Sequence, residues 1–315
     1  MLQQAESLLG AGLHCSEIIS GYSKAGAKAL EELETLATHQ PSNTRDVAEV
    51  SRFLKSTIDA KQYSFSSLLT PIIAQACIDV CPSDGSKFNT DSIRTVKILG
   101  GGVADTKLVC GFAMLAGAEG TIRHVQDAKI GVFVSGIDIP HTEVKGTLRF
   151  RHGEELENFA RSEEQELEQM IIQIKASGCN VVVSGQSVGE LAMHFLERYG
   201  LMVVKVQSKF QLRRLCQATK ARPLVRLGAP TPEEIGHASS VSIDEVGSLP
   251  LCTIAVDHAD EAEISTIIIR GSSTNICDDV ERCIDDGVHA YRAMALDPRF
   301  VAGAGSTEIE LAHRL

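Results

Sequence analysis

The feature that most constrains the fold is an alternation of short apolar runs with long helical patterns in the middle of the chain. The apolar runs have the length of strands and read "AKIGVFVSG", "CNVVVSG", "LMVVKVQ" and "RPLVRLG". Helical segments separate the first three runs. Because parallel strands need a long crossover connection, usually a helix, this alternation predicts an α/β layer with parallel strands.

Helix-rich segments flank this α/β block on both sides. Helical spacing runs over about 1–38, with one break at Gly10-Ala-Gly12, and over about 46–58, 64–81, 154–176 and 276–296, with short strands at 95–99 and 265–270. The chain has 315 residues, and a single core usually stops growing at roughly 250–300 residues, so several domains are expected. The arrangement predicts one domain inserted into another, with the outermost ends forming a third layer.

Composition excludes several classes of partner. Acidic residues outnumber basic ones by 41 to 30, which disfavours nucleic acid and anionic membrane surfaces, because both attract basic stripes. The beginning "MLQQAESLLG" has no basic region and no long apolar run, unlike a signal peptide. The most apolar stretch, "LLTPIIAQACIDV", is too short and too interrupted by polar residues to span a bilayer. We therefore expect neither nucleic acid nor membrane as a partner.

The cysteines indicate a reducing compartment. There are nine, an odd number, scattered mostly among apolar residues, which predicts reduced, buried thiols in a cytoplasmic protein. Cys77 and Cys81 lie four residues apart, but no second pair at metal spacing accompanies them. The histidines are dispersed as well. Core packing is therefore favoured over zinc, and no metal site is expected.

Two glycine-rich stretches could approach a phosphate. "ILGGGVADT" follows a predicted strand, but it fits neither the dinucleotide fingerprint nor a P-loop. A hinge or turn is the better interpretation of it. "VAGAGSTE" places Ser306-Thr307-Glu308 at a helix start directly behind its glycines. Taken alone, this second stretch is balanced between a helix-capping turn and an anion-binding loop.

Two charged helix faces also allow more than one interpretation. Helical spacing places Asp279, Arg282, Asp286 and His289 on one face. This face is either solvated, with an Arg282–Asp286 pair of about 0.3 kcal/mol, or it carries a carboxylate that orients water or holds Mg²⁺; the residues alone favour the solvated face. The basic run Ser208 to Arg222 could contact acidic partners or could be ordinary surface charge.

Taken together, motifs along the whole chain resemble those of group II chaperonin subunits, in particular subunits of the eukaryotic cytosolic ring. The resemblance is carried in order by "GLHCSEIISGY", "AKQYSF", "IIAQAC", "DSIRTVKILGGG", "VQDAKIGVF", "HTEVKGTL", "SKFQLRRLC", "EEIGHASSV", "ISTIIIRGSSTN", "DDVERCIDDGVHA" and "VAGAGSTEIELA". Any one stretch would be weak evidence, whereas the ordered set is specific.

The resemblance implies a multi-domain α/β protein with nested architecture. Residues 1–44 and 299–315 would form a partial all-α equatorial domain, and residues 45–111 and 259–298 an α+β intermediate domain. Residues 112–258 would form an α/β apical domain, whose helical protrusion runs from "HTEVKG" through Glu168. The family hydrolyses ATP with Mg²⁺. Its paralogous subunits assemble into a double ring in the cytoplasm that encloses unfolded client proteins.

The resemblance also assigns roles to individual residues. The family's catalytic aspartate falls on Asp286, where it would orient the attacking water, and this match overrules the solvated-face interpretation. The lysine that senses the γ-phosphate falls on Lys61. Gly303 and Gly305 fall in the glycine loop beside the nucleotide, where relatives usually carry three glycines in a row. Client contact is implied for the helix Ser208 to Ala221, through Lys209, Gln211, Arg213 and Arg214.

The match departs from the family pattern at both ends. The family's phosphate-cradling Gly-Asp-Gly-Thr-Thr loop would precede "LQQAESLL", and its long equatorial helices would follow "ELAHRL". The expectation is that this chain alone binds ATP weakly, hydrolyses none, and associates through the exposed apolar stripe of helices 1–38. An alternative is an ATP-independent module in which residues 112–258 bind unfolded proteins. A third hypothesis, a small-molecule enzyme using Gly100 to Gly102, lacks a nucleophile, base or metal cluster nearby.

Overall fold

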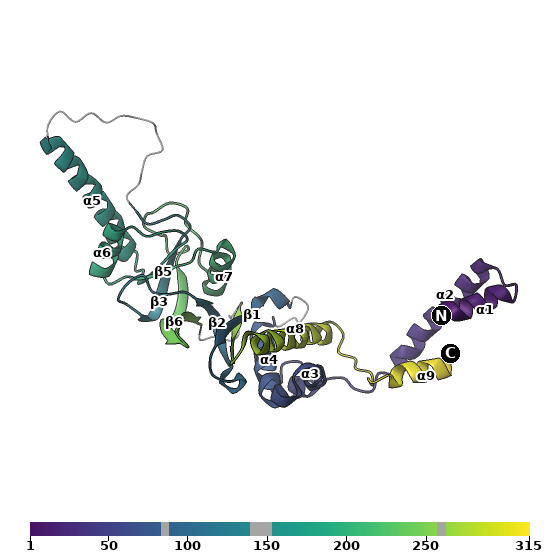
Figure 1. Ribbon diagram of the computed structural model, residues 1–315. Helices are drawn as coiled ribbons and strands as arrows, with labels where there is room; N and C mark the ends of the chain where they lie inside the picture. Colours follow the sequence, from purple (N-terminus) through teal and green to yellow (C-terminus); the bar gives the residue numbers. More distant parts are fainter. Residues whose placement is uncertain (83–87, 139–152, 257–262) are drawn as a thin grey trace. The chain divides into compact units, whose positions relative to one another are not determined.

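The structure is a computed structural model that describes residues 1–82, 88–138, 153–256 and 263–315 (Figure 1). Two compact units make up the chain. The first unit contains Met1–Thr44 together with Ala293–Leu315, and the second contains Arg45–Arg292. In the part of the chain that the structure describes, no helix has both the length and the apolar character needed to cross a membrane.

The first unit is helical. Its helices are α1 (Leu2–Gly10), α2 (Cys15–Thr35) and α9 (Ser306–Arg314), with the last residues of α8 (Thr274–Leu296). The predicted break near Gly10 is confirmed, and Gly12 turns the chain with φ +93°. His14 and Glu17 form a capping box that starts α2. Arg314 of α9 reaches Thr35 of α2 at 2.9 Å, so the two ends of the chain are joined within this unit.

The helical part of the second unit packs α3 (Val47–Gln62), α4 (Ser66–Val80) and α8 into one apolar layer. Helix α3 presents an apolar stripe inward, and α8 does so as the sequence spacing predicts from Val280 onward, although Ile276 near its start is exposed rather than inward. Helix α4 is buried over most of its length. Buried members of the layer are Val50, Leu54, Ile58, Leu69, Ile73, Val280, Ile284 and Val288. Tyr291 is fully buried and stacks edge-to-face on Phe88, with ring centroids 5.0 Å apart.

One eight-stranded sheet runs through the second unit in the order β1-β8-β2-β7-β6-β3-β4-β5. Its strands are β1 (Ile93–Leu99), β2 (Lys107–Leu115), β3 (His124–Phe133), β4 (Val181–Ser184), β5 (Met202–Lys205), β6 (Gly236–Val246), β7 (Leu249–Ala255) and β8 (Ser265–Gly271). Strands β3, β4 and β5 are parallel neighbours, which confirms the predicted α/β layer. Strands β1 and β8 are parallel as well, whereas β2, β6 and β7 pair antiparallel.

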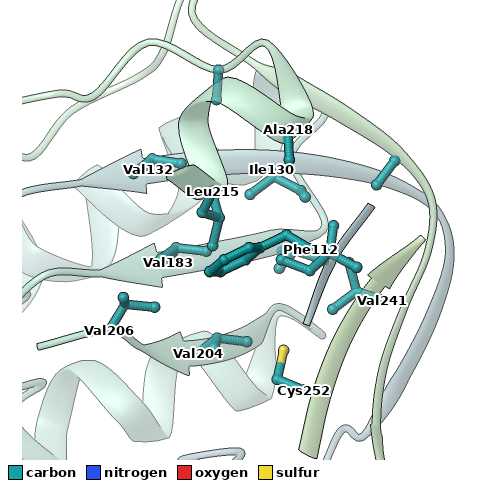
Figure 2. Close-up of a cluster of buried hydrophobic side chains, with 14 of the residues drawn as sticks. Phe112, Ile130, Val132, Val183, Val204, Val206, Leu215, Ala218, Val241 and Cys252 are labelled. Carbon is teal, nitrogen blue, oxygen red and sulfur yellow. The ribbon is translucent and has the colours of Figure 1, made fainter. Parts of the chain in front are cut away.

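Helices cover both faces of this sheet. Helix α7 (Lys209–Thr219) packs on one face, where Leu215 meets Phe112, Ile130 and Val183 in an aliphatic core (Figure 2). Helices α5 (Gly153–Ala176) and α6 (Glu190–Arg198) pack on a second core with Phe133, Val182 and Val203. Residues on alternate positions of β4 thus enter opposite cores, which explains why Val181, Val182 and Val183 are three apolar residues in succession.

Two expectations about strands need correction. The run Arg222–Gly228 is not a strand; it forms only one isolated parallel bridge, between Phe133 and Leu224. Pro223 has no N–H to give to a ladder, and the neighbouring Arg222 N–H bonds to Glu234 instead. The antiparallel hairpin β6–β7 went unpredicted, although Gly247-Ser248 at its tip, both with positive φ, is a two-residue hairpin turn.

Strand β2 changes partners at Gly111. Before this residue β2 pairs with β8, and from it onward β2 pairs with β7. Gly111 has φ +124°, and a Cβ built on it would lie 2.2 Å from the carbonyl oxygen of Ile254. Only glycine fits such a close approach of two backbones. The boundary between intermediate and apical segments that the family resemblance implies, at 111/112, falls at this residue and stays a prediction.

All nine cysteines are free thiols, and Cys15 alone is exposed. Burial raises the pKa of Cys216 to about 11 and that of Cys252 to about 12. Burial and a hydrogen bond to Asp79 raise the pKa of Cys110 to about 11. At pH 8 a thiol of pKa 11 is ionised roughly one time in a thousand, and the thiolate is the reactive form.

We therefore expect iodoacetamide at pH 8 to modify Cys15 within minutes and to leave the buried cysteines unmodified until the protein is denatured. Mass spectrometry of tryptic peptides, taken over a time course with and without guanidinium chloride, measures this directly. Labelling of Cys252 at the rate of Cys15 in the native protein would contradict the buried position of Cys252.

Candidate functional site

Asp286 is held in place by close packing of its own helix. Its neighbour Gly287 lets α8 approach α4, because a Cβ on Gly287 would lie 3.1 Å from Ile73 Cγ2. Cys283, one turn earlier, is buried with its Sγ 3.9 Å from the carbonyl oxygen of Ile58 in α3. Helix α8 is thus seated against both α3 and α4, and Asp286 lies at the rim of this contact.

Lys61, one turn after Ile58 at the end of α3, reaches Asp286. Its Nζ lies 3.1 Å from Asp286 Oδ2, and the two side chains remain 53% and 42% exposed. The structure therefore brings together two residues that lie far apart in the sequence. Arg282 does not form the predicted i,i+4 pair with Asp286; its guanidinium instead pairs with Asp279 at 3.1 Å. Asp286 is left facing Lys61 and solvent.

Other acidic residues of α8 have partners or surroundings of their own. Lys97 of β1 bonds to both Asp278 and Glu281 at 2.8 Å, which ties α8 to the sheet edge. Burial and the nearby Glu281 raise the pKa of Asp285. Burial, with the charge of Asp286, raises the pKa of Cys283 to about 11. The thiol beside the pair is therefore neutral at physiological pH.

The glycine loop at residues 303–305 lies in the first unit. Ala304 and Gly305 both adopt left-handed backbone conformations, with φ +59° and φ +81°. Ser306 Oγ donates a hydrogen bond to the carbonyl oxygen of Gly303 at 2.7 Å as α9 begins. A Cβ on Gly303 or Gly305 would meet no atom within 4 Å. The loop is open to close approach, and Ala304 holds a conformation that costs a non-glycine residue roughly 1–2 kcal/mol.

Helix α7 exposes its polar face to solvent and buries its apolar face against the sheet. Lys209 and Arg213 are exposed, while Gln211 and Arg214 are half-buried. Phe210, which sequence reasoning passed over, is 75% exposed beside them. The only signal for it was an aromatic residue at the polar start of a helix. The surface made by Lys209, Phe210 and Arg213 combines positive charge with apolar area.

The triple-glycine stretch Gly100–Gly102 is a turn, as predicted, and the side chain of Arg270 occupies the space beside its glycines. The Nε of Arg270 donates to the carbonyl oxygen of Gly100 at 2.7 Å, and its Nη2 lies 3.2 Å from where a Cβ of Gly101 would be. Among the described residues, no group of three or more His, Cys, Asp or Glu residues is placed to hold a metal ion.

Comparison with known proteins identifies what the chain is similar to. The model of the TCP-1/cpn60 chaperonin family matches residues 1–315. The curated proteins named T-complex protein 1 subunit theta are 47% identical in Dictyostelium discoideum, 44% in Arabidopsis thaliana and 42% in Homo sapiens. Each match covers 100% of this chain, and the chain spans 57–58% of the length of these relatives.

A solved structure shares the fold. The open-state monomer of a group II chaperonin from Methanococcoides burtonii superposes with a TM-score of 0.69 at 24% identity, covering 100% of this chain and 72% of that one. This likeness agrees with the mixed helical and α/β architecture, and the family match extends over every motif that suggested it. The chain belongs to the TCP-1/cpn60 chaperonin family.

Proposed function

We propose that this chain acts as a subunit of an ATP-dependent cytoplasmic chaperonin, within a ring of paralogous subunits that encloses and folds unfolded client proteins. The observation that carries the proposal is the Lys61–Asp286 pair, which is held on rigid helices, open to solvent, and made of the two residues that the family resemblance selects. The family match and the names of the relatives support the same conclusion.

In this proposal Asp286 accepts a hydrogen bond from the water that attacks the γ-phosphate and so orients it. Lys61 places a positive charge beside the same position, and its contact with Asp286 is exchanged for a phosphate oxygen when nucleotide binds. Phosphoryl transfer depends on this kind of positioning and charge neutralisation rather than on covalent chemistry by the protein. Gly303 and Gly305 provide an open backbone loop for the nucleotide.

ATP supplies the phosphoryl group, and Mg²⁺ neutralises its developing charge when bound. The residues of this chain fit the nucleotide in two respects, since the glycine loop leaves space for close approach and the Lys61–Asp286 pair is accessible. In the described ranges they offer no grouped carboxylates for Mg²⁺. We therefore assign to this chain the water-orienting and phosphate-sensing groups.

The experiment that tests the proposal is ATP turnover by an assembly of this chain with paralogous chaperonin subunits, measured together with refolding of a denatured client. Turnover and refolding that both depend on Asp286 are expected. An assembly that refolds its client equally well when Asp286 is replaced and ATP is omitted would leave only the alternative, an ATP-independent binding module.

A second activity, binding of unfolded chains, is favoured by the exposed face of α7. Phe210 offers apolar area, while Lys209 and Arg213 offer charge to acidic segments of a client, with Gln211 and Arg214 beside them. Unfolded proteins expose both kinds of surface, and an exposed aromatic residue ringed by polar ones is typical of binding hot spots.

We expect Phe210→Ser to weaken suppression of client aggregation at least threefold in the absence of ATP. Light scattering of a diluted, denatured client, titrated with the purified chain, measures this. The matched control is Leu191→Ser, since Leu191 is 41% exposed on α6, away from α7. Equal effects of the two substitutions would show that general surface hydrophobicity, rather than the α7 face, holds the client.

A further inference from the structure

The guanidinium of Arg270 lies where two segments of the second unit meet. Arg270 is the penultimate residue of β8, next to the Gly100–Gly102 turn that follows β1, and its Nε donates to the carbonyl oxygen of Gly100 at 2.7 Å. The backbone of the same segment is fastened to the turn as well, because the Gly100 N–H donates to the carbonyl oxygen of Gly271 at 2.8 Å. One side of the guanidinium is therefore fixed to the turn.

The other side faces the tip of the β6–β7 hairpin. A Cβ built on Gly247 would lie 3.6 Å from Arg270 Nη2, and one built on Gly101 would lie 3.2 Å from the same atom. The Gly247 Cβ would also lie 2.6 Å from the carbonyl oxygen of Leu99, so the hairpin tip rests on the backbone at the end of β1, directly before the turn. Three glycines, counting Gly100 at 3.8 Å, thus leave room around one guanidinium nitrogen.

We propose that Arg270 is a latch that holds the β6–β7 hairpin against the Gly100–Gly102 turn. The hairpin belongs to the segment assigned to the apical domain and the turn to the segment assigned to the intermediate domain. The latch therefore joins the two parts whose relative movement the proposed function requires, and to that extent it rests on the proposed function. Because α8, which carries Asp286, begins at Thr274, four residues after Arg270, the latch also lies at the base of the helix with the candidate catalytic residue.

Hydrogen exchange of the full chain tests the latch without ATP. In Arg270→Ala, we expect amide exchange to become at least tenfold faster in two peptides, one covering the Gly100–Gly102 turn and one covering the hairpin tip. Gly247→Ala, whose Cβ would meet both the carbonyl oxygen of Leu99 and Arg270 Nη2 across the same contact, should accelerate exchange in the turn peptide as well. The double variant should exchange no faster than the faster single variant, since both substitutions open the same contact.

Gly200→Ala is the matched control. Gly200 also has a left-handed backbone, with φ +66°, but a Cβ there meets open space, so this substitution introduces strain without touching the latch. Arg270→Lys keeps the charge and loses the Nε donor, so it should accelerate amide exchange in the same two peptides to an intermediate extent. It replaces Arg270→Ala as the test variant if that variant does not fold. Unchanged exchange in the turn peptide of Gly247→Ala, or multiplicative effects in the double variant, would overturn the latch. Neither outcome depends on whether the chain supports ATP hydrolysis.

Discussion

Replacing Asp286 with asparagine is expected to lower ATP turnover about 100-fold or more at the sites to which this chain contributes. Asparagine keeps the shape of the side chain but offers no carboxylate to orient and polarise the attacking water, and general-base positioning is worth roughly 10²–10⁴ in rate. Since the substitution leaves the proposed nucleotide contacts of Lys61 and the glycine loop in place, ATP affinity should change less than threefold. The loss belongs to the chemical step.

The measurement needs a background in which the other subunits are silent. An assembly whose paralogous subunits carry asparagine at their corresponding positions reports turnover from this chain alone. Asp279→Asn is the matched control, because Asp279 is an exposed carboxylate on the same helix that pairs with Arg282 at 3.1 Å, the same separation as Lys61–Asp286. Turnover in the control should stay within twofold of the unchanged chain. A comparable loss from both substitutions would show that the charge of α8, and not the position of Asp286, matters.

Replacing Gly111 with alanine is expected to destabilise the second unit by about 4 kcal/mol or more, an effect at the upper end of what single substitutions produce. The added methyl group would lie 2.2 Å from the carbonyl oxygen of Ile254, which is backbone and cannot rotate away. The φ of +124° is also strained for any residue with a Cβ. Relief requires β2 and β7 to separate where β2 changes partners.

Guanidinium denaturation followed by circular dichroism measures this loss as a shift of the unfolding midpoint. Gly228→Ala is the control in the same unit, because a Cβ on Gly228 meets no atom within 4 Å and its φ is not left-handed. That substitution should shift the free energy of unfolding by less than about 0.5 kcal/mol. If Gly111→Ala unfolds at the same denaturant concentration as the control, the sheet accommodates the methyl group and the close approach has no energetic weight.

Apolar periodicity predicted those helices and strands whose buried residues follow a regular spacing. Strands β4 and β5 and the last four residues of β3 are buried on both faces. Helices α3, α5 and α8 carry an apolar residue every three to four positions, so these patterns can be recognised from the sequence alone. The hairpin β6–β7 was missed because Ser239 and Ser240 are two polar residues in succession and interrupt the alternation of β6. Its register depends instead on the left-handed turn at Gly247-Ser248, a local feature that only two residues of the sequence indicate.

The candidate site divides in the same way. Helical spacing placed Asp286 on an exposed face but assigned Arg282 as its partner. Spacing within one helix carries no information about residues of other helices, and the observed partner of Asp286 is Lys61 of α3. The assignment of Lys61 and Asp286 as candidates came from the family resemblance, and their contact came from the structure. Residues 303–305 could be recognised as a loop from their glycines, yet the left-handed conformation of Ala304 contradicts local propensity and could not be predicted.

The pairing of β1 with β8 has a consequence for synthesis on the ribosome. Ile93 lies beside Ser265 in this parallel ladder, and all of β2 to β7 is made between them. At translation rates of about 5–20 residues per second, β1 leaves the ribosome roughly 9–34 seconds before its partner exists. During that interval β1 has an unpaired edge, which is a template for aggregation. The nascent chain of this chaperonin relative therefore passes through the same exposed state that its family is proposed to shelter in other proteins.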